Sequence, residues 1–426
     1  MNFDLETHDS ISIVGGGIIG LCVGYELSKA GYKVVIIDRD PNWSQSSAQK
    51  NAGMIVPSHF IPLAAPGVVK LGLKWMFSRK SPFALSPQLN LEMWRWCWTL
   101  YRHANREHVE RCGPLLRDIG LLSRRLFDEI AEQLCIPLER HGLLMLCQTE
   151  AALHKESQTA EQANSLGIEA EVCIADRLRE LDPNATINAI GGVWFPQDAH
   201  LDSKTLLTKL RDAVEKNGGQ IVQGEVQRLH VRGNRLAALE LKDGQTYSAR
   251  SFVLSGGAWS QDLARQLNLR LPLQAGKGYS FTMENVPELP ALCSILVEAR
   301  VAVTPIGNCL RVAGTMEIGG NDLRVNQRRT EGIIESFCRY YSAFKPENFV
   351  GIEPWAGLRP CSPDGLPYIG KLLHLQNVIV ATGHAMLGLS LGPVTGLLVK
   401  QILADEEPAI DVKPLAPYRF DKRYKV

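Results

Sequence analysis

Three glycines and one carboxylate near the start of the chain have the residue types and spacing of a nucleotide-binding site. Gly15, Gly17 and Gly20 form the pattern G-x-G-x-x-G, and their lack of side chains lets backbone N–H groups approach a pyrophosphate. Asp38 follows in the same segment, where a carboxylate can accept hydrogen bonds from both hydroxyls of a ribose. These residues predict a dinucleotide site without identifying the dinucleotide, and a purely structural turn is the alternative.

The segments around these residues have the pattern of a strand, a helix and a second strand. Residues 11–14 are an apolar run, residues 21–30 have helical periodicity, Gly31 suits a left-handed helix end, and residues 32–37 are a second apolar run. The glycine loop then leads into a helix N-terminus, whose positive potential favours phosphates. We expect this unit to open a parallel sheet.

The rest of the chain predicts a nucleotide-binding domain in separate pieces, with a second domain inserted between them. A chain of 426 residues exceeds what one hydrophobic core usually supports. Residues 88–135 are helical in period, and residues 265–349 alternate like an antiparallel sheet. Other expected elements are a helix at 201–219, a strand at 221–224, hairpin strands over 225–254 and a last helix at about 393–404. The predicted domains are 1–60 with 200–262 and 350–426, and 61–199 with 263–349.

Composition and charge argue against several classes of function. Lys and Arg number 46 and Asp and Glu 45, so the net charge of +1 gives no field that would recruit nucleic acid. The ten cysteines form no C-x-x-C pair and no metal-ligand spacing, which favours reduced thiols and no bound metal. The start of the chain lacks the pattern of a signal peptide, and no uncharged apolar run reaches the roughly 20 residues of a membrane span. We expect a cytoplasmic protein that does not cross a membrane.

Four further segments resemble a known family. They are SQSSAQKNAGMI (44–55), SGGAWS (255–260), GLRPCSPDGLPYIG (357–370) and VIVATGHAMLGLSLGPVTGLLV (378–399). With the glycine loop they resemble the FAD-dependent amino acid oxidoreductases of the D-amino acid oxidase superfamily, and most of all the bacterial D-amino acid dehydrogenases. The resemblance implies an α/β fold, α+β overall. It would have a Rossmann-like FAD-binding domain of the p-hydroxybenzoate hydroxylase/D-amino acid oxidase type and a substrate domain built on an antiparallel sheet.

The resemblance also implies which residues hold FAD. The glycine loop would bind the pyrophosphate, Asp38 the adenosine ribose and Val226 the adenine, and the other segments would line the path to the isoalloxazine ring. Many relatives have Glu in place of Asp38, which changes the length of the arm but not the hydrogen bonds. The implied cofactor residues are Gly15, Gly17, Ile18, Ile19, Gly20, Asp38, Arg39, Ser46, Ser47, Asn51, Ala52, Gly53, Met54, Val226, Gly256, Gly257, Trp259, Gly383, His384, Leu387, Gly388 and Leu389.

The last helix has a possible use in this chemistry. Reduced flavin develops negative charge near N1 and C2=O, which a helix N-terminus directed there would stabilise. Small residues precede a strong helix after Pro393. An ordinary C-terminal helix is the alternative.

Arg359 is the main candidate for substrate binding. The resemblance places it at the substrate carboxylate, and a planar guanidinium suits bidentate capture of a planar anion. Tyr279 and His59 resemble family positions near the substrate and the flavin, with a core aromatic residue and a structural histidine as alternatives; Lys277 and Tyr368 are weaker candidates. The implied reaction is oxidative deamination of a D-amino acid by hydride transfer from Cα to flavin N5. The imino acid then hydrolyses to a 2-oxo acid and ammonia.

Two departures from the family pattern favour a dehydrogenase over an oxidase. In a loose alignment, Arg311 lies where sarcosine oxidases place a flavin-facing lysine, and Met386 lies where glycine oxidase has a second arginine. We therefore expect a quinone or another carrier as electron acceptor. The alternatives are a secondary-amine oxidoreductase acting on D-proline, hydroxyproline, sarcosine or another N-methyl amino acid, a non-catalytic flavin-binding subunit or redox sensor, and an NAD-dependent dehydrogenase.

One segment bears on membrane contact. Residues 68–80 (VVKLGLKWMFSRK) mix cations with large apolar side chains, as helices at membrane surfaces do. Peripheral binding at the inner face of the plasma membrane and a solvated helix over the second domain are both open interpretations. Trp94, Trp98 and Tyr101 are spaced for one helix face and are interpreted as core residues rather than a quinone platform.

Overall fold

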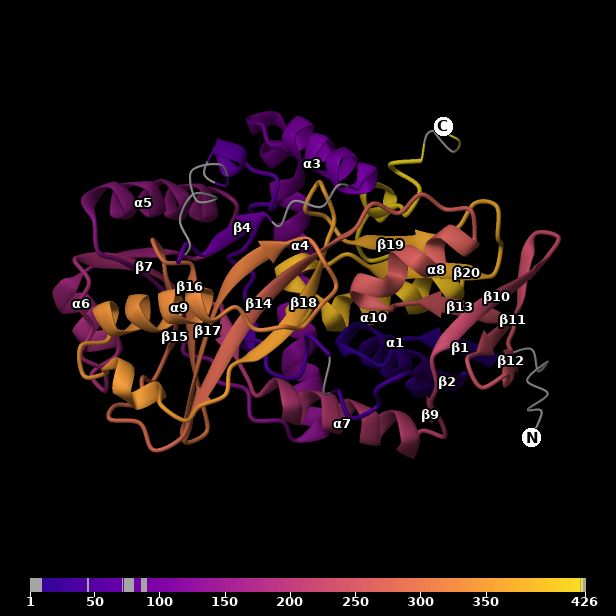
Figure 1. Ribbon diagram of the computed structural model, residues 1–426, viewed down its shortest axis with the longest axis horizontal. Coiled ribbons are helices and arrows are strands. Elements are labelled where there is room, and N and C mark those ends of the chain that lie inside the picture. Colours follow the sequence, from indigo (N-terminus) through magenta and orange to yellow (C-terminus); the bar gives the residue numbers. More distant parts are fainter. Residues whose placement is uncertain are drawn as a thin grey trace.

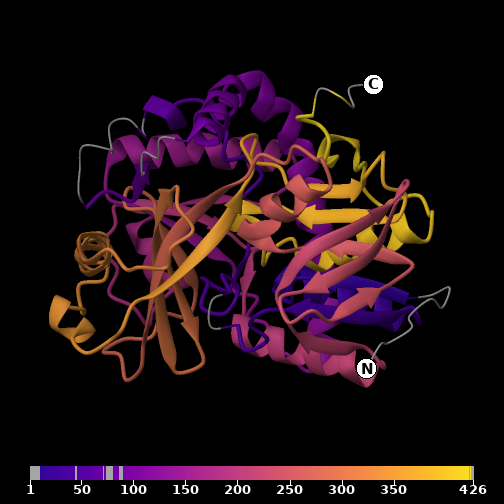
Figure 2. The ribbon, with the colours of Figure 1, turned by 45° about the vertical axis from the view of Figure 1, so that its right-hand side comes forward.

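Two β-sheets organise the molecule. The computed structural model describes residues 10–43, 46–70, 72, 80–85, 90–421 and 423. A mainly parallel sheet lies at the right of Figure 1 and a larger mixed sheet at the left, and Figure 2 shows the two side by side from another direction. The chain crosses between them several times, as the predicted insertion requires.

The parallel sheet has the order β19-β20-β13-β1-β2-β9 in the described part of the chain. Every neighbouring pair is parallel except β19 and β20. Its central strands are apolar and buried because helices cover the sheet. The bounds are β1 Ser10–Val14, β2 Lys33–Asp38, β9 Gln220–Gln223, β13 Ser251–Leu254, β19 Tyr368–Lys371 and β20 Val378–Thr382.

Helix α1 (Ile18–Lys29) packs against α7 (Ser203–Lys216) and α10 (Gly392–Leu403) beside this sheet. Helix α1 starts at the glycine loop, earlier than predicted, and Gly31 has the expected left-handed conformation with φ +88°. Helix α7 begins where the Asp202 carboxylate accepts hydrogen bonds from two backbone N–H groups of its first turn. These three helices and the first two strands confirm the elements predicted there.

A small sheet and several short elements complete this half of the molecule. Strands β10, β11 and β12 form antiparallel hairpins at the right edge of Figure 1, with Gly233 and Gly244 in the predicted turns. The bounds are β10 Val226–Arg232, β11 Arg235–Leu241, β12 Thr246–Ser248, α8 Ser260–Gln266, η1 Gly257–Trp259, η3 Ala385–Leu387 and η4 Lys413–Leu415.

The mixed sheet has the order β18-β14-β17-β16-β15-β5-β7-β6 among the described residues, with β4 also paired to β17. Its pairs are antiparallel except β15 with β5 and β17 with β4. The β5–β15 pair joins the two predicted pieces of the inserted domain in one sheet. The bounds are β4 Phe83–Leu85, β5 Leu143–Cys147, β6 Glu171–Ile174, β7 Gly191–Phe195, β14 Gln274–Met283, β15 Cys293–Leu296, β16 Val301–Ile306, β17 Cys309–Ile318 and β18 Trp355–Cys361.

The predicted helical region 88–135 forms two helices, α3 (Leu91–His103) and α4 (Arg106–Leu134). The interpretation of its aromatic stripe as core was wrong: Trp94, Trp98 and Tyr101 are 61%, 62% and 59% exposed. A second stripe on the opposite side of α3 is buried instead, so the helix is apolar on two sides. Other elements of this half are α5 Glu150–Ser165, α6 Ala175–Leu181, α9 Gln327–Tyr340, η2 Pro346–Phe349 and the small β3 Met54–Ile55 and β8 Ala199–His200 pair.

Strand β18 bears on the predicted domain boundary at residue 350. It lies inside the range 350–426 but pairs with β14 of the mixed sheet. We propose that residues 350–361 belong with that sheet.

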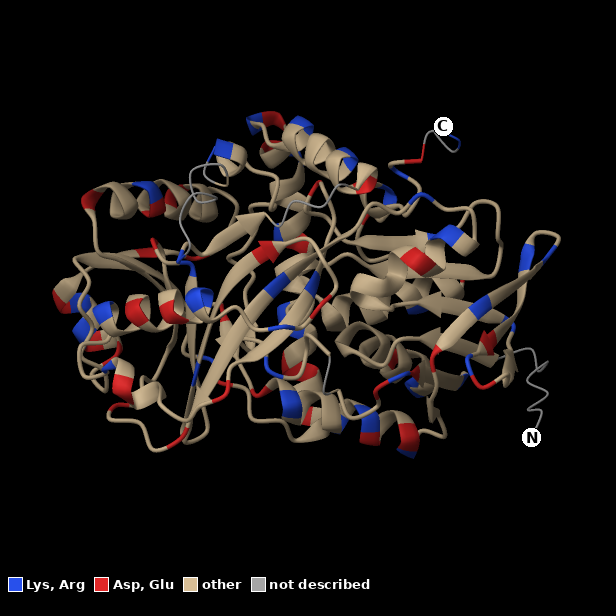
Figure 3. Cartoon of the chain, viewed as in Figure 1, with Lys and Arg blue, Asp and Glu red and all other residues tan. Residues whose placement is uncertain are grey.

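Basic and acidic residues are interspersed on both halves in the view of Figure 3. None of the described helices combines the length and apolarity needed to cross a bilayer, and residues 71 and 73–79 of the basic segment lie outside the described residues.

Candidate functional site

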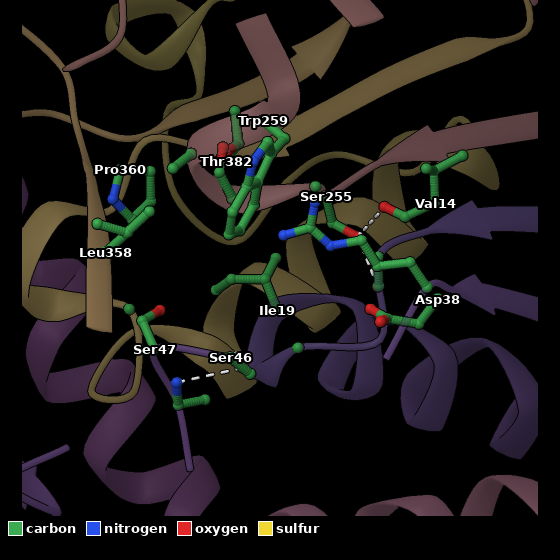
Figure 4. Close-up of a pocket in the computed structure, with 18 of the residues that line it drawn as sticks. Val14, Ile19, Asp38, Ser46, Ser47, Ser255, Trp259, Leu358, Pro360 and Thr382 are labelled. Carbon is green, nitrogen blue, oxygen red and sulfur yellow. Dashed lines mark hydrogen bonds between the residues drawn. The ribbon is translucent and has the colours of Figure 1, made fainter. Parts of the chain in front are cut away.

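A cavity of about 430 Å³ opens where the parallel strands end. Val14, Asp38, Ser255 and Thr382 line it at or just after the carboxyl ends of β1, β2, β13 and β20, and Figure 4 shows them around one open space. The carboxyl edge of such a sheet is where α/β proteins bind ligands. Strand β18 of the mixed sheet supplies another wall through Leu358, Arg359 and Pro360. We call this space the main cavity.

The structure brings together most of the cofactor residues that the sequence predicts. Those that line the main cavity are Gly15, Gly17, Ile18, Ile19, Asp38, Arg39, Ser46, Ser47, Asn51, Val226, Gly256, Gly257, Trp259, His384, Gly388 and Leu389. Those that do not line it are Gly20, Ala52, Gly53, Met54, Gly383 and Leu387.

The glycine loop packs so closely that Gly15 and Gly20 leave no room for a side chain. Gly15 has φ +103°, and an added Cβ would lie 2.5 Å from the Ser255 carbonyl oxygen. At Gly20 an added Cβ would lie 1.8 Å from the Gly15 oxygen, so this glycine allows α1 to pack against the loop. Gly17 is the N-cap of α1 and provides no side-chain acceptor for the first turn. The N–H groups at this helix end are therefore suited to an anion.

A second helix starts near the same place. Gly392 and Gly396 of α10 face Cys22 of α1, where an added Cβ would lie 3.0 Å from the Cys22 sulfur and 2.6 Å from its carbonyl oxygen, respectively. Gly392 also faces Ile18, whereas Gly396 faces Glu26, so the two helices run in the same direction. Both N-termini therefore point to the end of the sheet that carries the main cavity, and their positive potentials add there.

Asp38 and Arg39 shape the far end of the cavity. One Asp38 oxygen accepts the Gly16 N–H at 2.5 Å and the other accepts the Asp40 N–H at 2.7 Å. Burial raises the pKa of Asp38, and these two bonds oppose that rise. The Arg39 guanidinium lies over the Trp259 ring at 3.7 Å. Free acceptor positions on the carboxylate suit hydroxyl groups of a ribose.

His384 lies in the loop before α10. Its Nε2 contacts the Thr395 hydroxyl at 2.9 Å, and Nδ1 has no hydrogen-bond partner among the described residues. Burial lowers the pKa of His384 to about 3, so the ring is neutral near pH 7. A neutral imidazole with one unpaired nitrogen can bind a polar group of a cofactor.

Arg359 projects from β18 beside the cavity. Its Nη1 donates to the Thr315 carbonyl at 3.0 Å, and no acidic side chain of the described residues forms an ion pair with it. Burial lowers the pKa of the guanidinium, as removal of water from a cation does. The group lies over Gly278, where an added Cβ would be 2.1 Å from Nη1. A desolvated guanidinium without a carboxylate partner is suited to bind one.

The structure does not bring Tyr279 together with Arg359. Gly276 pairs with Arg359 and Tyr279 with Ala356, and this register puts the two side chains on opposite faces of the sheet. Tyr279 is buried, and its hydroxyl accepts the Asn326 N–H at 3.3 Å.

The remaining candidates have partners of their own. His59 lies beside Ser58, whose hydroxyl donates to Asp198 at 2.5 Å, and it does not line the main cavity. Lys277 forms ion pairs with Glu317 and Asp322, and the Tyr368 hydroxyl donates to the Pro272 carbonyl. Of the substrate candidates, Arg359 alone lines the main cavity in the described part of the chain.

Leu358 was missed from sequence, and Met386 and Arg311 were named only by comparison with family positions. Met386 and Leu358 line the cavity, and Arg311 holds the loop at Asn51 through a bond of 3.0 Å to its carbonyl. Met386 was compared only with a family position, and Leu358 lies next to Arg359 in its motif. Arg311 carried no positional signal because its partner is far away in the sequence.

Comparisons with known proteins show the family and the fold of the chain. A family model described as DAO, FAD dependent oxidoreductase, matches residues 10–402. A D-amino acid dehydrogenase of Granulibacter bethesdensis is 27% identical over 421 residues, which cover 96% of this chain and 99% of that protein. The crystal structure of glycine oxidase from Geobacillus kaustophilus superposes with a TM-score of 0.76 at 24% identity, covering 96% and 98% of the two chains. For L-proline dehydrogenase from P. horikoshii the TM-score is 0.73 at 16% identity, covering 97% and 98%.

Proposed function

Since the chain belongs to the DAO family of FAD-dependent oxidoreductases, we propose that it oxidises a D-amino acid in the main cavity and passes the electrons to a quinone or another carrier. FAD is the cofactor of the family. When bound, FAD supplies the acceptor for a hydride from the substrate. The D-amino acid dehydrogenase of Granulibacter bethesdensis supports this choice of substrate class.

The proposed cofactor residues are those of the main cavity. The glycine loop and the first turn of α1 would hold the pyrophosphate, and Asp38 would hold the ribose of the adenosine. Ser46, Ser47 and Asn51 on one side and the loop 383–389 on another would hold the isoalloxazine ring. The orphaned Nδ1 of His384 and the open surroundings of Gly17, where an added Cβ would meet no atom nearer than 3.7 Å, both fit this occupant.

Arg359 is the observation that carries the proposed substrate. Its guanidinium is desolvated, unpaired with any acid among the described residues, and placed at the cavity wall. It would bind the substrate carboxylate through two parallel hydrogen bonds and so fix the position of Cα. The neutral amine then needs no strong base, because its lone pair assists the departure of the hydride. The imino acid product would hydrolyse to a 2-oxo acid and ammonia.

Anaerobic reduction by a panel of amines tests this proposal. The purified yellow protein is mixed without oxygen with D-amino acids, L-amino acids, proline, hydroxyproline and sarcosine, and the flavin absorbance is followed. We expect bleaching by D-amino acids with free primary amines. Bleaching by sarcosine or proline alone would show a secondary-amine oxidoreductase, and no bleaching by any amine would favour a redox sensor or subunit. A colourless protein would point to another dinucleotide.

The electron acceptor is tested with the same substrates in air. In the loose alignment, Met386 lies where glycine oxidase has a second arginine and Arg311 lies where sarcosine oxidases place a flavin-facing lysine, which supports a dehydrogenase. We expect slow peroxide formation in air and fast turnover with a soluble quinone analogue. Peroxide formed rapidly and in equal amount to the substrate consumed would show an oxidase.

A further inference from the structure

The segment 46–54, which lines the main cavity at Ser46, Ser47 and Asn51, has its backbone held in an unusual way. Five successive carbonyl groups, from Gln49 to Gly53, each accept a hydrogen bond from elsewhere in the protein. The donors are Ser203 to Gln49 at 2.9 Å, Ser280 to Lys50 at 2.8 Å, Arg311 to Asn51 at 3.0 Å, Thr304 to Ala52 at 2.6 Å, and the Leu201 N–H to Gly53 at 2.9 Å. We call the side chains of Ser203, Ser280, Arg311 and Thr304 the carbonyl clamp.

Three members of the carbonyl clamp belong to the mixed sheet. Arg311 pairs in register with Thr304 on one side and with Thr282 on the other, and Ser280 is two residues from Thr282 along β14. Side chains two apart along a strand share a face. Gly276, which pairs with Arg359, lies on that face as well. One sheet face therefore carries both the proposed substrate anchor and the residues that hold segment 46–54.

Anchored carbonyls fix the direction of the neighbouring N–H groups. In a planar trans peptide the C=O and the next N–H point in opposite directions. The N–H groups of Lys50, Asn51 and Ala52 therefore point away from their clamp residues, and they have no acceptor among the described residues. Of these three residues Asn51 lines the main cavity, where a fixed, unpaired amide can stabilise charge that develops on a bound group.

Arg311 differs from the other clamp members by its charge. It is 5% exposed, and its nearest carboxylate, Asp202, is 3.9 Å away and already caps α7. Its Nε also donates to the Thr282 hydroxyl at 3.1 Å, so the guanidinium is fixed in place. A hydroxyl would suffice to hold a carbonyl, as Ser280 and Thr304 do. The buried cation thus adds positive potential behind segment 46–54.

We propose that Arg311 is a positioning residue for the flavin. Through the Asn51 carbonyl it holds segment 46–54 where that segment lines the main cavity, and its charge favours the reduced cofactor. This inference rests on the proposed position of the flavin in the main cavity. It also links the flavin and Arg359 to one sheet, so that the acceptor and the substrate anchor keep a constant separation.

The test compares Arg311→Met with Arg311→Lys and with the double variant Ser280→Ala/Thr304→Val. The midpoint potential is measured by equilibration with a reference dye, and FAD affinity by titration of the apoprotein; neither needs a substrate. We expect Arg311→Met to lower the reduced fraction at a given potential at least about tenfold, which is about 30 mV for a two-electron couple. Arg311→Lys should keep a midpoint potential close to that of the wild type, because it keeps the charge. The double variant should weaken FAD binding with a smaller change in potential, because it keeps the charge.

Other outcomes separate this inference from the proposed function. If Arg311→Met is less stable but binds FAD with unchanged affinity and potential, Arg311 is merely structural and the inference is wrong. If Arg311→Met does not fold, Arg311→Lys decides, because a wild-type potential with weakened FAD affinity would support positioning through the lost hydrogen bonds. Failure of the substrate panel with a normal Arg311 effect would overturn the D-amino acid proposal alone.

Discussion

At the scale of single residues, the position of the Arg359 side chain depends on Gly278, which has no side chain of its own. Gly278 pairs directly with Gly357, and the Arg359 guanidinium occupies the space that a side chain at 278 would fill. Trp355 occupies the matching space over Gly357, where an added Cβ would lie 2.2 Å from its ring. The lack of a side chain at Gly278 and Gly357 thus lets the guanidinium of Arg359 and the indole of Trp355 lie over the sheet.

Gly278→Ala tests this arrangement. Since φ at Gly278 is not positive, alanine fits the backbone, and the new methyl group displaces only the flexible end of Arg359. Loss of a charge-assisted bond at the carboxylate should raise KM for the amino acid by about tenfold to a hundredfold. FAD affinity should not change. Substrate KM and FAD affinity are measured side by side.

Gly113→Ala is the control for this change. It adds the same methyl group in α4, where no atom lies nearer than 3.8 Å, and should leave KM as it was. An unchanged KM in Gly278→Ala would mean that Arg359 does not hold the carboxylate in the position seen here.

These residues also show what a single sequence can reveal. The chemistry of Asp38 and Gly15 is local, since a turn, a helix start and a carboxylate lie within one β-α-β unit, and they were predicted as cofactor residues. Arg311 was named only by comparison with a family position, and its clamp partners were not found, because their contacts with segment 46–54 join residues that are far apart in the chain. The position of Tyr279 depends on the register of β14 with β18, which alternation within one strand cannot give.

At the scale of elements, helix α3 is the largest departure from expectation. Helical spacing showed that its aromatic residues share a face, but not which face turns inward. Met93 and Trp96 are buried, and the Trp96 Nε1–H donates to the Cys361 carbonyl at 3.0 Å. With two apolar stripes, periodicity alone cannot choose the buried one. The outer stripe is left in solvent, although large aromatic side chains favour burial.

This outer stripe makes the proposed membrane contact testable. Leu91, Trp94, Trp98 and Tyr101 are exposed along α3, and tryptophan and tyrosine favour the interface of a bilayer. We expect the protein to co-sediment with vesicles of mixed phosphatidylglycerol and phosphatidylcholine, and Trp94→Gln/Trp98→Gln to reduce the bound fraction several-fold.

The control for this experiment is Val350→Gln, which changes an exposed apolar residue outside α3 and should bind vesicles as the wild type does. Binding that persists in the tryptophan double variant would remove α3 from the contact. Residues 68–80 would then be the remaining candidate for the membrane contact.

At the scale of the whole molecule, the two sheets meet around the main cavity, and each contributes different chemistry. The parallel sheet offers two helix N-termini and the glycine loop, which suit phosphates. The mixed sheet offers Arg359 and three of the four members of the carbonyl clamp. The sequence indicated this division, because the glycine motif and the alternating segments are local patterns. It could not show that β18 leaves the C-terminal piece to join the mixed sheet, since strand pairing is a long-range property.

Burial of titratable groups between these layers predicts how stability depends on pH. Burial lowers the pKa of His59 and His200 to about 4 and that of His384 to about 3. Between about pH 6.5 and 4 the unfolded chain therefore binds more protons than the folded protein, so stability falls as the pH is lowered. Burial raises the pKa of Asp198 to about 7, which acts in the opposite direction: the unfolded chain loses this proton first as pH rises from about 4 to 7.

Burial also lowers the pKa of His108, so four histidines act against Asp198, and we expect the thermal midpoint of the wild type to fall between pH 6.5 and 4. A shift of one pKa unit between the unfolded and folded states changes the free energy of unfolding by ~1.4 kcal/mol. Asp198→Asn removes the opposing group. Its amide oxygen can still accept the Ser58 N–H, and its NH2 group can donate to the Ser58 hydroxyl oxygen, which lies 3.1 Å from His59 Nδ1. The midpoint of this variant should therefore fall more steeply over this range. Relative to wild type, the variant should gain stability at pH 7.5 compared with pH 4. Parallel midpoint curves for the two proteins would show that Asp198 is ionised when buried, and a flat wild-type curve would show that the four histidines can be protonated in the folded state.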